Sequence, residues 1–213
     1  MNNNAGFMNG FNTMCEWIVK FAYLNVLWFL FMVLGLGIFG IFPATIAMFT
    51  IIRKWIMGDT NRRMFPLFWE TYKTEFIKSN KLGVIFAVIG FILYIDLLFV
   101  FTVENTYAGY LFFPLIMMAL VYVLTLLYVF PVYVHYDITI RQTIKNAFFI
   151  MVFSPISSAL LVLSIFTLWF LAISFPAVIP FFSVNVLSWL VMYFANHSFL
   201  KIQRKQVNLA NKS

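Results

Sequence analysis

Long apolar tracts alternate with short polar segments along this chain, and five of the tracts are long enough to concern a membrane. They cover residues 21–52, 82–103, 111–134, 147–173 and 177–200. No Lys, Arg, Asp or Glu occurs between Lys145 and Lys201. At 1.5 Å per helical residue, that stretch is far longer than the ~30 Å hydrocarbon core of a bilayer. It must therefore cross a membrane and return, which predicts an all-α, polytopic membrane helix bundle.

The number of helices depends on the first tract. Gly35, Gly37, Gly40 and Pro43 lie near its centre, where a single membrane-spanning helix tolerates them least. We therefore expect a helical hairpin here, and hence six transmembrane helices. One broken helix, and hence five, is the alternative. Residues 174–176 and Pro180 divide the last apolar stretch into two helices joined by a tight turn.

Charge indicates the orientation in the membrane. The net charge is +7, and the cationic residues cluster in residues 53–81, 141–145 and 201–212. Cytoplasmic loops of membrane proteins carry this excess of Lys and Arg, so we expect these segments and the tail 201–213 in the cytoplasm. Lys20 joins them only in the six-helix arrangement, which places both termini inside. Basic patches beside apolar runs are typical of contact with anionic lipid, so no nucleic-acid partner is predicted.

Composition agrees with one membrane domain over residues 1–213. The chain is 63% apolar and 10% charged, with a mean hydropathy of +0.95, whereas soluble domains carry roughly 25% charge. The single cysteine, Cys15, excludes an intramolecular disulfide and a multi-cysteine metal site. The sequence has no phosphate-binding loop, no His-Glu-x-x-His and no nucleophile elbow. We therefore expect no enzymatic activity and no cofactor, and the lipid bilayer is the predicted surrounding.

Residues 58–81 form a predicted amphipathic connector on the cytoplasmic side. Pro66 suits a first helical turn, and aromatic residues follow at spacings of three or four. Two interpretations stay open: a helix lying in the headgroup region, or a helix that docks on a partner. The candidate membrane- or partner-docking residues are Phe68, Trp69, Tyr72 and Lys73.

Asp96 is the candidate intramembrane functional residue. A carboxylate at the centre of a spanning helix costs about 2.5–3.5 kcal/mol, so it either contacts an ion, a proton or a substrate, or forms a helix-packing hydrogen bond. It also lies beyond the midpoint of its tract, toward the outer interface. A second group, His135, Asp137, Arg141 and Lys145, is interpreted as solvated loop charge.

Several motifs resemble the YesL-like family of bacterial membrane proteins of unknown function. They are residues 24–28 (LNVLW), residues 42–46 (FPATI), the basic stretch from Phe68 to Lys81, and residues 141–147 (RQTIKNA). Ala47 departs from the family, which often has Gly there. The resemblance implies a small multi-pass protein of Gram-positive bacteria, often encoded with carbohydrate ABC importers and polysaccharide-degrading enzymes. It implies no catalytic residues.

Two functional hypotheses follow. The first is a non-enzymatic protein of the bacterial plasma membrane that is accessory to a membrane complex, with carbohydrate importer subunits or a second copy of itself as partners. The alternative is a small transporter or channel that uses Asp96 and the helices interrupted by Pro and Gly.

Overall fold

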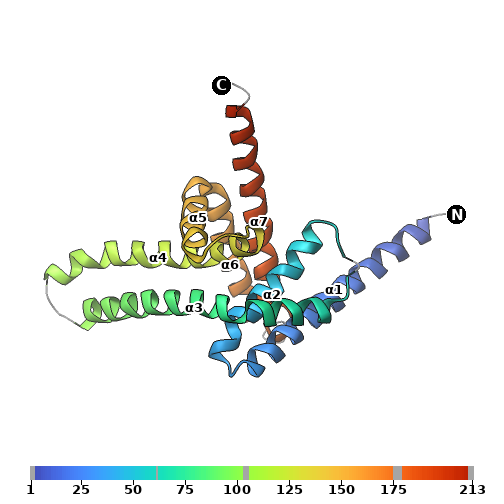
Figure 1. Cartoon of the computed structure of the whole chain (residues 1–213), viewed down its shortest axis with the longest axis horizontal. Coiled ribbons are helices and arrows are strands. Elements are labelled where there is room, and N and C mark those ends of the chain that lie inside the picture. The colour runs from blue at the N-terminus through green and yellow to red at the C-terminus, as the bar shows by residue number, and fades with distance from the viewer. Residues whose placement is uncertain (1–2, 61, 103–105, 175–178, 211–213) are drawn as a thin grey trace.

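The structure is a computed structural model that describes residues 3–60, 62–102, 106–174 and 179–210. These residues form seven α-helices and no strand (Figure 1). The helices are α1 (Asn3–Leu34), α2 (Ile38–Ile56), α3 (Met64–Thr102), α4 (Thr106–His135), α5 (Ile140–Phe153), α6 (Pro155–Ser174) and α7 (Ile179–Ala210). The all-α prediction is confirmed.

The predicted break in the first apolar tract is also confirmed, because α1 ends at Leu34 and α2 begins at Ile38. Leu36 and Gly37 turn the chain with φ angles of 58° and 74°. The two helices then meet very closely, since a Cβ on Gly40 would lie 2.3 Å from the carbonyl oxygen of Met32. Only a residue without a side chain fits at this approach. The glycine cluster therefore makes both the turn and the contact.

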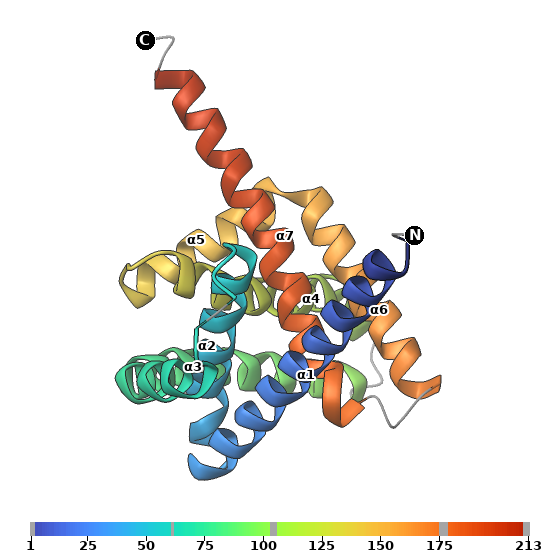
Figure 2. The same ribbon diagram turned by 90° about the vertical axis from the view of Figure 1, so that its right-hand side faces the viewer.

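Helix α2 lies at the centre of the molecule and packs against α1, α3, α4 and α7 (Figure 2). In its most apolar stretch of 18 residues, 61% of α2 is buried inside the protein. The same share is 22% for α1, 28% for α4 and 11% for α3. Pro43 lies inside α2 and its ring is buried. Most other helices expose long apolar faces, as expected where lipid rather than protein covers them.

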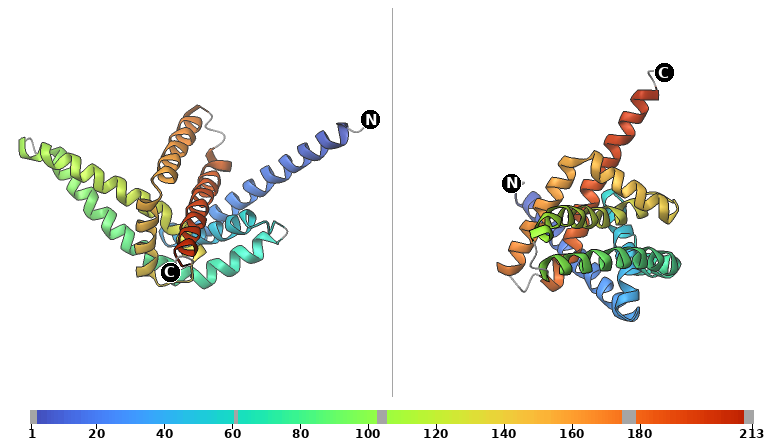
Figure 3. Two further views of the ribbon diagram at one scale, coloured as in Figure 1. Left: turned by 90° about the horizontal axis from the view of Figure 1, so that it is seen from above. Right: turned by 90° about the vertical axis from the view of Figure 1, so that its left-hand side faces the viewer.

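Helix α3 joins two different halves. Residues 64–81 carry the charges that were assigned to a connector, and residues 82–102 are apolar except for Asp96. The helical part of the predicted connector is continuous with the apolar part, because α3 runs from Met64 to Thr102 without a break. Its cytoplasmic location stays a prediction. Seen from above, its charged half runs in a different direction from its apolar half, which pairs with α4 (Figure 3). The Tyr122 hydroxyl of α4 donates a hydrogen bond of 2.8 Å to the Phe86 carbonyl of α3.

The last three helices are connected by a bend and by buried hydroxyls. Helices α5 and α6 meet at Ser154 with a bend of 93°. Ser198 of α7 donates to Ser157 of α6 at 3.0 Å, and Ser158 donates to Tyr128 of α4 at 3.3 Å. The small residues around Pro155 therefore support close helix contact. Residues 175–178, which include most of the expected turn before Pro180, lie outside the described residues.

Six spans are not confirmed. Within the described residues, four helices are long and apolar enough to cross a membrane, and a fifth candidate arises if α5 and α6 form one bent span. The four are found in Gly10–Leu34, Ile38–Ile56, Met64–Thr102 and Tyr110–His135. Helix α2 meets both criteria although most of its apolar window is buried inside the protein, so length and apolarity alone do not decide whether it crosses.

The close approach of α1 and α2 gives a first prediction. Gly40→Ala should destabilise the purified protein by about 1–3 kcal/mol in a mixed-micelle denaturant titration, because the added methyl group overlaps the backbone of Met32. Gly10→Ala is the control, since nothing lies within 4 Å of the Cβ it adds. Equal unfolding midpoints for the two variants would contradict the tight contact.

Candidate functional site

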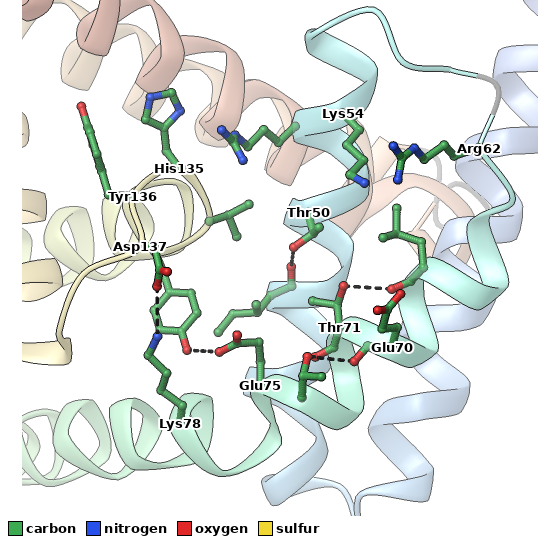
Figure 4. A pocket seen from close by; sticks show the side chains of 16 residues that line it. Thr50, Lys54, Arg62, Glu70, Thr71, Glu75, Lys78, His135, Tyr136 and Asp137 are labelled. Atoms are coloured by element: carbon green, nitrogen blue, oxygen red, sulfur yellow. Dashed lines mark hydrogen bonds and ion pairs between the residues drawn. The ribbon is translucent and has the colours of Figure 1, made fainter.

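A cavity of about 530 Å³ lies between the end of α2, the charged half of α3 and the end of α4 (Figure 4). Its lining is unusually polar for a molecule of this composition. The ionisable side chains that line it are Arg53, Lys54, Arg62, Glu70, Glu75, Lys78, His135, Tyr133, Tyr136 and Asp137. Apolar helices thus end in a charged recess on one side of the molecule.

The acidic side chains of the recess connect α3 to the end of α4. The Tyr133 hydroxyl donates a hydrogen bond to the Glu75 carboxylate. Lys78 lies 3.8 Å from Asp137, and its ammonium group also lies 5.2 Å from the centre of the Tyr133 ring. Because the Lys78–Asp137 pair is exposed, its contribution to stability is small, and the buried Tyr133 contact dominates.

The cationic side chains are less well paired. Arg62 forms an exposed ion pair of 2.8 Å with Asp59. Among the described residues, no carboxylate lies within 4.0 Å of Arg53 or Lys54. The Nε atom of Arg53 is buried and has no hydrogen-bond partner there. The recess therefore has spare hydrogen-bond donors and positive charge on its α2 side.

The aromatic end of α4 closes another side of the recess. The His135 ring lies 4.6 Å from the ring of Phe199 in α7, and its Nδ1 atom is buried without a hydrogen-bond partner among the described residues. Burial raises the pKa of the Tyr136 phenol, which therefore stays protonated at neutral pH. In the described part of the chain, no three His, Cys, Asp or Glu side chains could hold a metal ion together. The recess suits the binding of a polar or charged group.

The candidate docking residues divide between two faces of α3. Phe68 and Tyr72 are buried, with ring centres 4.9 and 5.0 Å from that of Phe31 in α1. The Tyr72 hydroxyl also donates to the Phe31 carbonyl at 3.1 Å. Trp69 is 48% exposed and Lys73 is exposed. Docking of lipid or a partner thus stays a prediction for Trp69 and Lys73, whereas Phe68 and Tyr72 are occupied by this chain.

The exposed residues form one stripe at intervals of four, which we call the outer stripe: Phe65, Trp69, Lys73 and Ile77. The opposite face of the same helix lines the recess with Glu70, Thr74 and Lys78. The charged half of α3 therefore presents two surfaces, the outer stripe and the wall of the recess. The sequence pattern identified the aromatic content but not which aromatic residues α1 covers.

Asp96 lies away from the recess. It is exposed on the apolar half of α3 and lines a groove of about 480 Å³ between α3 and α4, with mostly apolar neighbours such as Met118 and Leu93. A functional role for Asp96 stays a prediction.

The second sequence group is separated by the fold. His135 and Asp137 line the recess, whereas Arg141 and Lys145 do not. Sequence reasoning missed the contribution of Arg53, Lys54, Glu70 and Glu75. In the sequence, Arg53 and Lys54 only follow an apolar tract, and Glu70 and Glu75 only lie within the predicted connector.

Comparison with known proteins finds relatives without an assigned activity. Residues 21–97 match a family described as "Protein of unknown function, DUF624". Three relatives come from Bacillus subtilis (strain 168). The uncharacterized protein YteU is 40% identical, over 89% of this chain and 85% of its own length. The uncharacterized protein YesL is 33% identical over 93% of each chain, and the uncharacterized protein YesV is 35% identical over 89% and 91%. No solved structure matches.

The Tyr133–Glu75 hydrogen bond gives a second prediction. Tyr133→Phe leaves a partly buried carboxylate without its donor and should cost about 1.5–3 kcal/mol of stability. Glu75→Gln should remove much of the same interaction, so the double variant should lose less than the sum. Denaturant titrations of the purified variants in micelles measure these losses of stability. The control is Glu70→Gln, an exposed acid on the same wall, and an equal loss there would contradict the account.

Proposed function

We propose a function for this chain, which belongs to the DUF624 family of YesL-like proteins, as the resemblance of its motifs predicted. Its long apolar helices indicate a membrane protein. We propose a non-enzymatic protein of the bacterial plasma membrane that is accessory to a membrane complex. A carbohydrate importer is the partner that the family resemblance favours.

The outer stripe is the observation that carries this proposal. The buried face of the charged half of α3 packs on α1 through Phe68 and Tyr72. The Phe65 and Trp69 rings of the stripe also approach Phe31, at 6.2 and 5.6 Å, but each keeps about half of its surface exposed. It combines half-exposed aromatic rings with the cation Lys73, which is a composition suited to a protein interface at the membrane surface. A complex component can therefore bind Phe65, Trp69 and Ile77 without unfolding the bundle.

The depth of the stripe follows from the apolar half of α3. Residues 82–102 are by themselves long enough to cross the ~30 Å hydrocarbon core, so Gly83 lies at its boundary. A Cβ on Gly83 would lie 2.5 Å from the Phe42 ring, and Lys81 lines the same groove as Phe39. The start of α2 therefore lies at this boundary too. Its other end carries Arg53 and Lys54 beside the recess.

Both ends of α2 are thus next to charged residues of α3, and α1 follows α2 closely. Trp28 of α1 donates to the Thr45 hydroxyl at 3.1 Å, and the Trp17 and Trp55 rings lie 5.5 Å apart.

We propose that the α1–α2 hairpin stays on the side of the charged segment and does not cross. The spans are then the apolar half of α3, α4, the bent α5–α6 pair and α7. All Lys and Arg residues, Lys20 included, then lie on the cytoplasmic side with both termini.

The transporter alternative gains less support. It requires Asp96 to face a wet interior, whereas Asp96 is exposed in a groove with mostly apolar lining. The recess and this groove share no lining residue.

Cysteine labelling tests the hairpin. In a Cys15→Ser background, an impermeant maleimide applied to intact cells should label Tyr110→Cys but neither Leu36→Cys nor Phe11→Cys, all of which are exposed positions. All three should react after permeabilisation. Labelling of Leu36→Cys from outside would contradict the proposal and restore six spans. Labelling of Phe11→Cys alone would show that α1 crosses, which gives five.

Crosslinking tests the accessory role. A photoreactive amino acid at position 69 should capture one defined protein of the native membrane, because Trp69 lies at the centre of the outer stripe. The same amino acid at Val88, an exposed position on the apolar half of the helix, should capture only lipid. Mass spectrometry identifies the product. Recovery of the chain alone from both positions, at every detergent strength, would contradict the role.

A further inference from the structure

On the α2 side of the recess, two cations lack an ion pair among the described residues. Glu75 accepts from Tyr133, Asp137 lies opposite Lys78, and Asp59 outside the recess pairs with Arg62. Arg53 and Lys54 remain without an ion pair among the described residues, and so do the lining acids Glu70 and Glu75. Glu75 and Asp137 contact other groups, so no described acid forms an ion pair with the two cations of α2.

The cations also converge. Arg53, Lys54 and Arg62 line the same cavity, and Figure 4 shows the charged ends of Lys54 and Arg62 turned toward one another. Like charges that share a recess repel each other unless an anion lies between them. Arg53 adds a buried Nε without an acceptor among the described residues, and His135 at the end of α4 adds a buried Nδ1 without a hydrogen-bond partner there. A neutral occupant would leave Arg53 and Lys54 without an ionic partner.

The geometry and chemistry match one class of ligand. A guanidinium group presents its donors in a fixed fork that suits the oxygens of a phosphate, and an ammonium group adds a compact charge. A simple salt bridge with a carboxylate would use only part of this set. The volume of about 530 Å³ also exceeds what a single ion needs, so the rest of a phosphorylated molecule fits beside Thr50 and Thr74.

We propose that the recess is a binding site for a phosphate group, held by Arg53 and Lys54 with Arg62 at its edge. The group belongs either to an anionic phospholipid of the inner leaflet or to a soluble phosphorylated compound. Both sources offer the same oxygens. Because the recess and the outer stripe lie on opposite faces of the charged half of α3, an occupied recess supports the helix on which the partner docks.

The test uses the purified full chain in nanodiscs of phosphatidylcholine. Inorganic phosphate is added at an ionic strength matched with chloride, and the midpoint of thermal unfolding is followed. A second arm replaces part of the phosphatidylcholine by phosphatidylglycerol without free phosphate. We expect stabilisation in one arm at least, and that arm identifies the source.

Variants locate the effect. Arg53→Gln and Lys54→Gln should weaken the apparent affinity about tenfold or more, as expected for loss of one charged contact. The apparent affinity of Arg53→Lys should lie between those of the wild type and Arg53→Gln, because lysine keeps the charge but lacks the forked donors of the guanidinium group. Arg63→Gln is the matched control: it removes one exposed charge from the same segment outside the recess and should stay within about twofold of the wild type.

Two results would overturn the proposal: no stabilisation of the wild type in either arm, or an equal loss in Arg63→Gln and Arg53→Gln. If Arg53→Gln does not fold, an unchanged Lys54→Gln beside a responsive wild type overturns it as well. The measurement contains no partner protein of the native membrane, and so its failure is distinguishable from a failure of docking at Trp69.

Discussion

The contact between α2 and the junction of the two halves of α3 is the constraint on which the rest of the structure depends. The Phe42 ring occupies the space above Gly83, and α2 is the most buried of the candidate spans among the described residues. A helix as apolar as α2 would be read as crossing the bilayer by itself. Here it lies beside the part of α3 that carries Glu70 and Lys81, which are costly in hydrocarbon. Under our proposal, this neighbour and not its own composition decides the depth of α2.

The recess is a consequence of the same contact. Helix α2 supplies Arg53 and Lys54 from its last turn, where cations favour the negative end of the helix dipole. The charged half of α3 supplies Glu75 and Lys78, and the end of α4 supplies Tyr133. Each helix contributes polar residues only where its apolar part stops. Charge thus gathers on one side of the molecule, and only part of it is internally paired.

Much of the fold could be predicted from the sequence, because hydrophobic length and helix-breaking residues act locally. The break at Gly35–Gly37 and the division of the chain into apolar helices are of this kind. The number of spans could not be predicted, since the burial of α2 arises from contacts with residues far along the chain. The same holds for Phe68 and Trp69, which are neighbours with equal aromatic character. Both rings lie near Phe31, at 4.9 and 5.6 Å, yet Phe68 is fully buried and Trp69 stays half exposed. For the candidate site, His135 and Asp137 carried a signal, whereas Arg53 and Lys54 resembled ordinary basic residues at a membrane boundary.

The most direct test of the account is a disulfide between α2 and the junction in α3. Phe42 and Gly83 are both replaced by Cys in a Cys15→Ser background, and native membranes are treated with a mild oxidant. The account predicts rapid loss of both thiols by formation of one intramolecular disulfide, because the Phe42 ring directly covers Gly83. A Phe42→Cys, Val88→Cys pair should stay reduced. Two free thiols in the Phe42/Gly83 pair, both reactive with a permeant maleimide, would contradict the placement of α2 beside the charged segment.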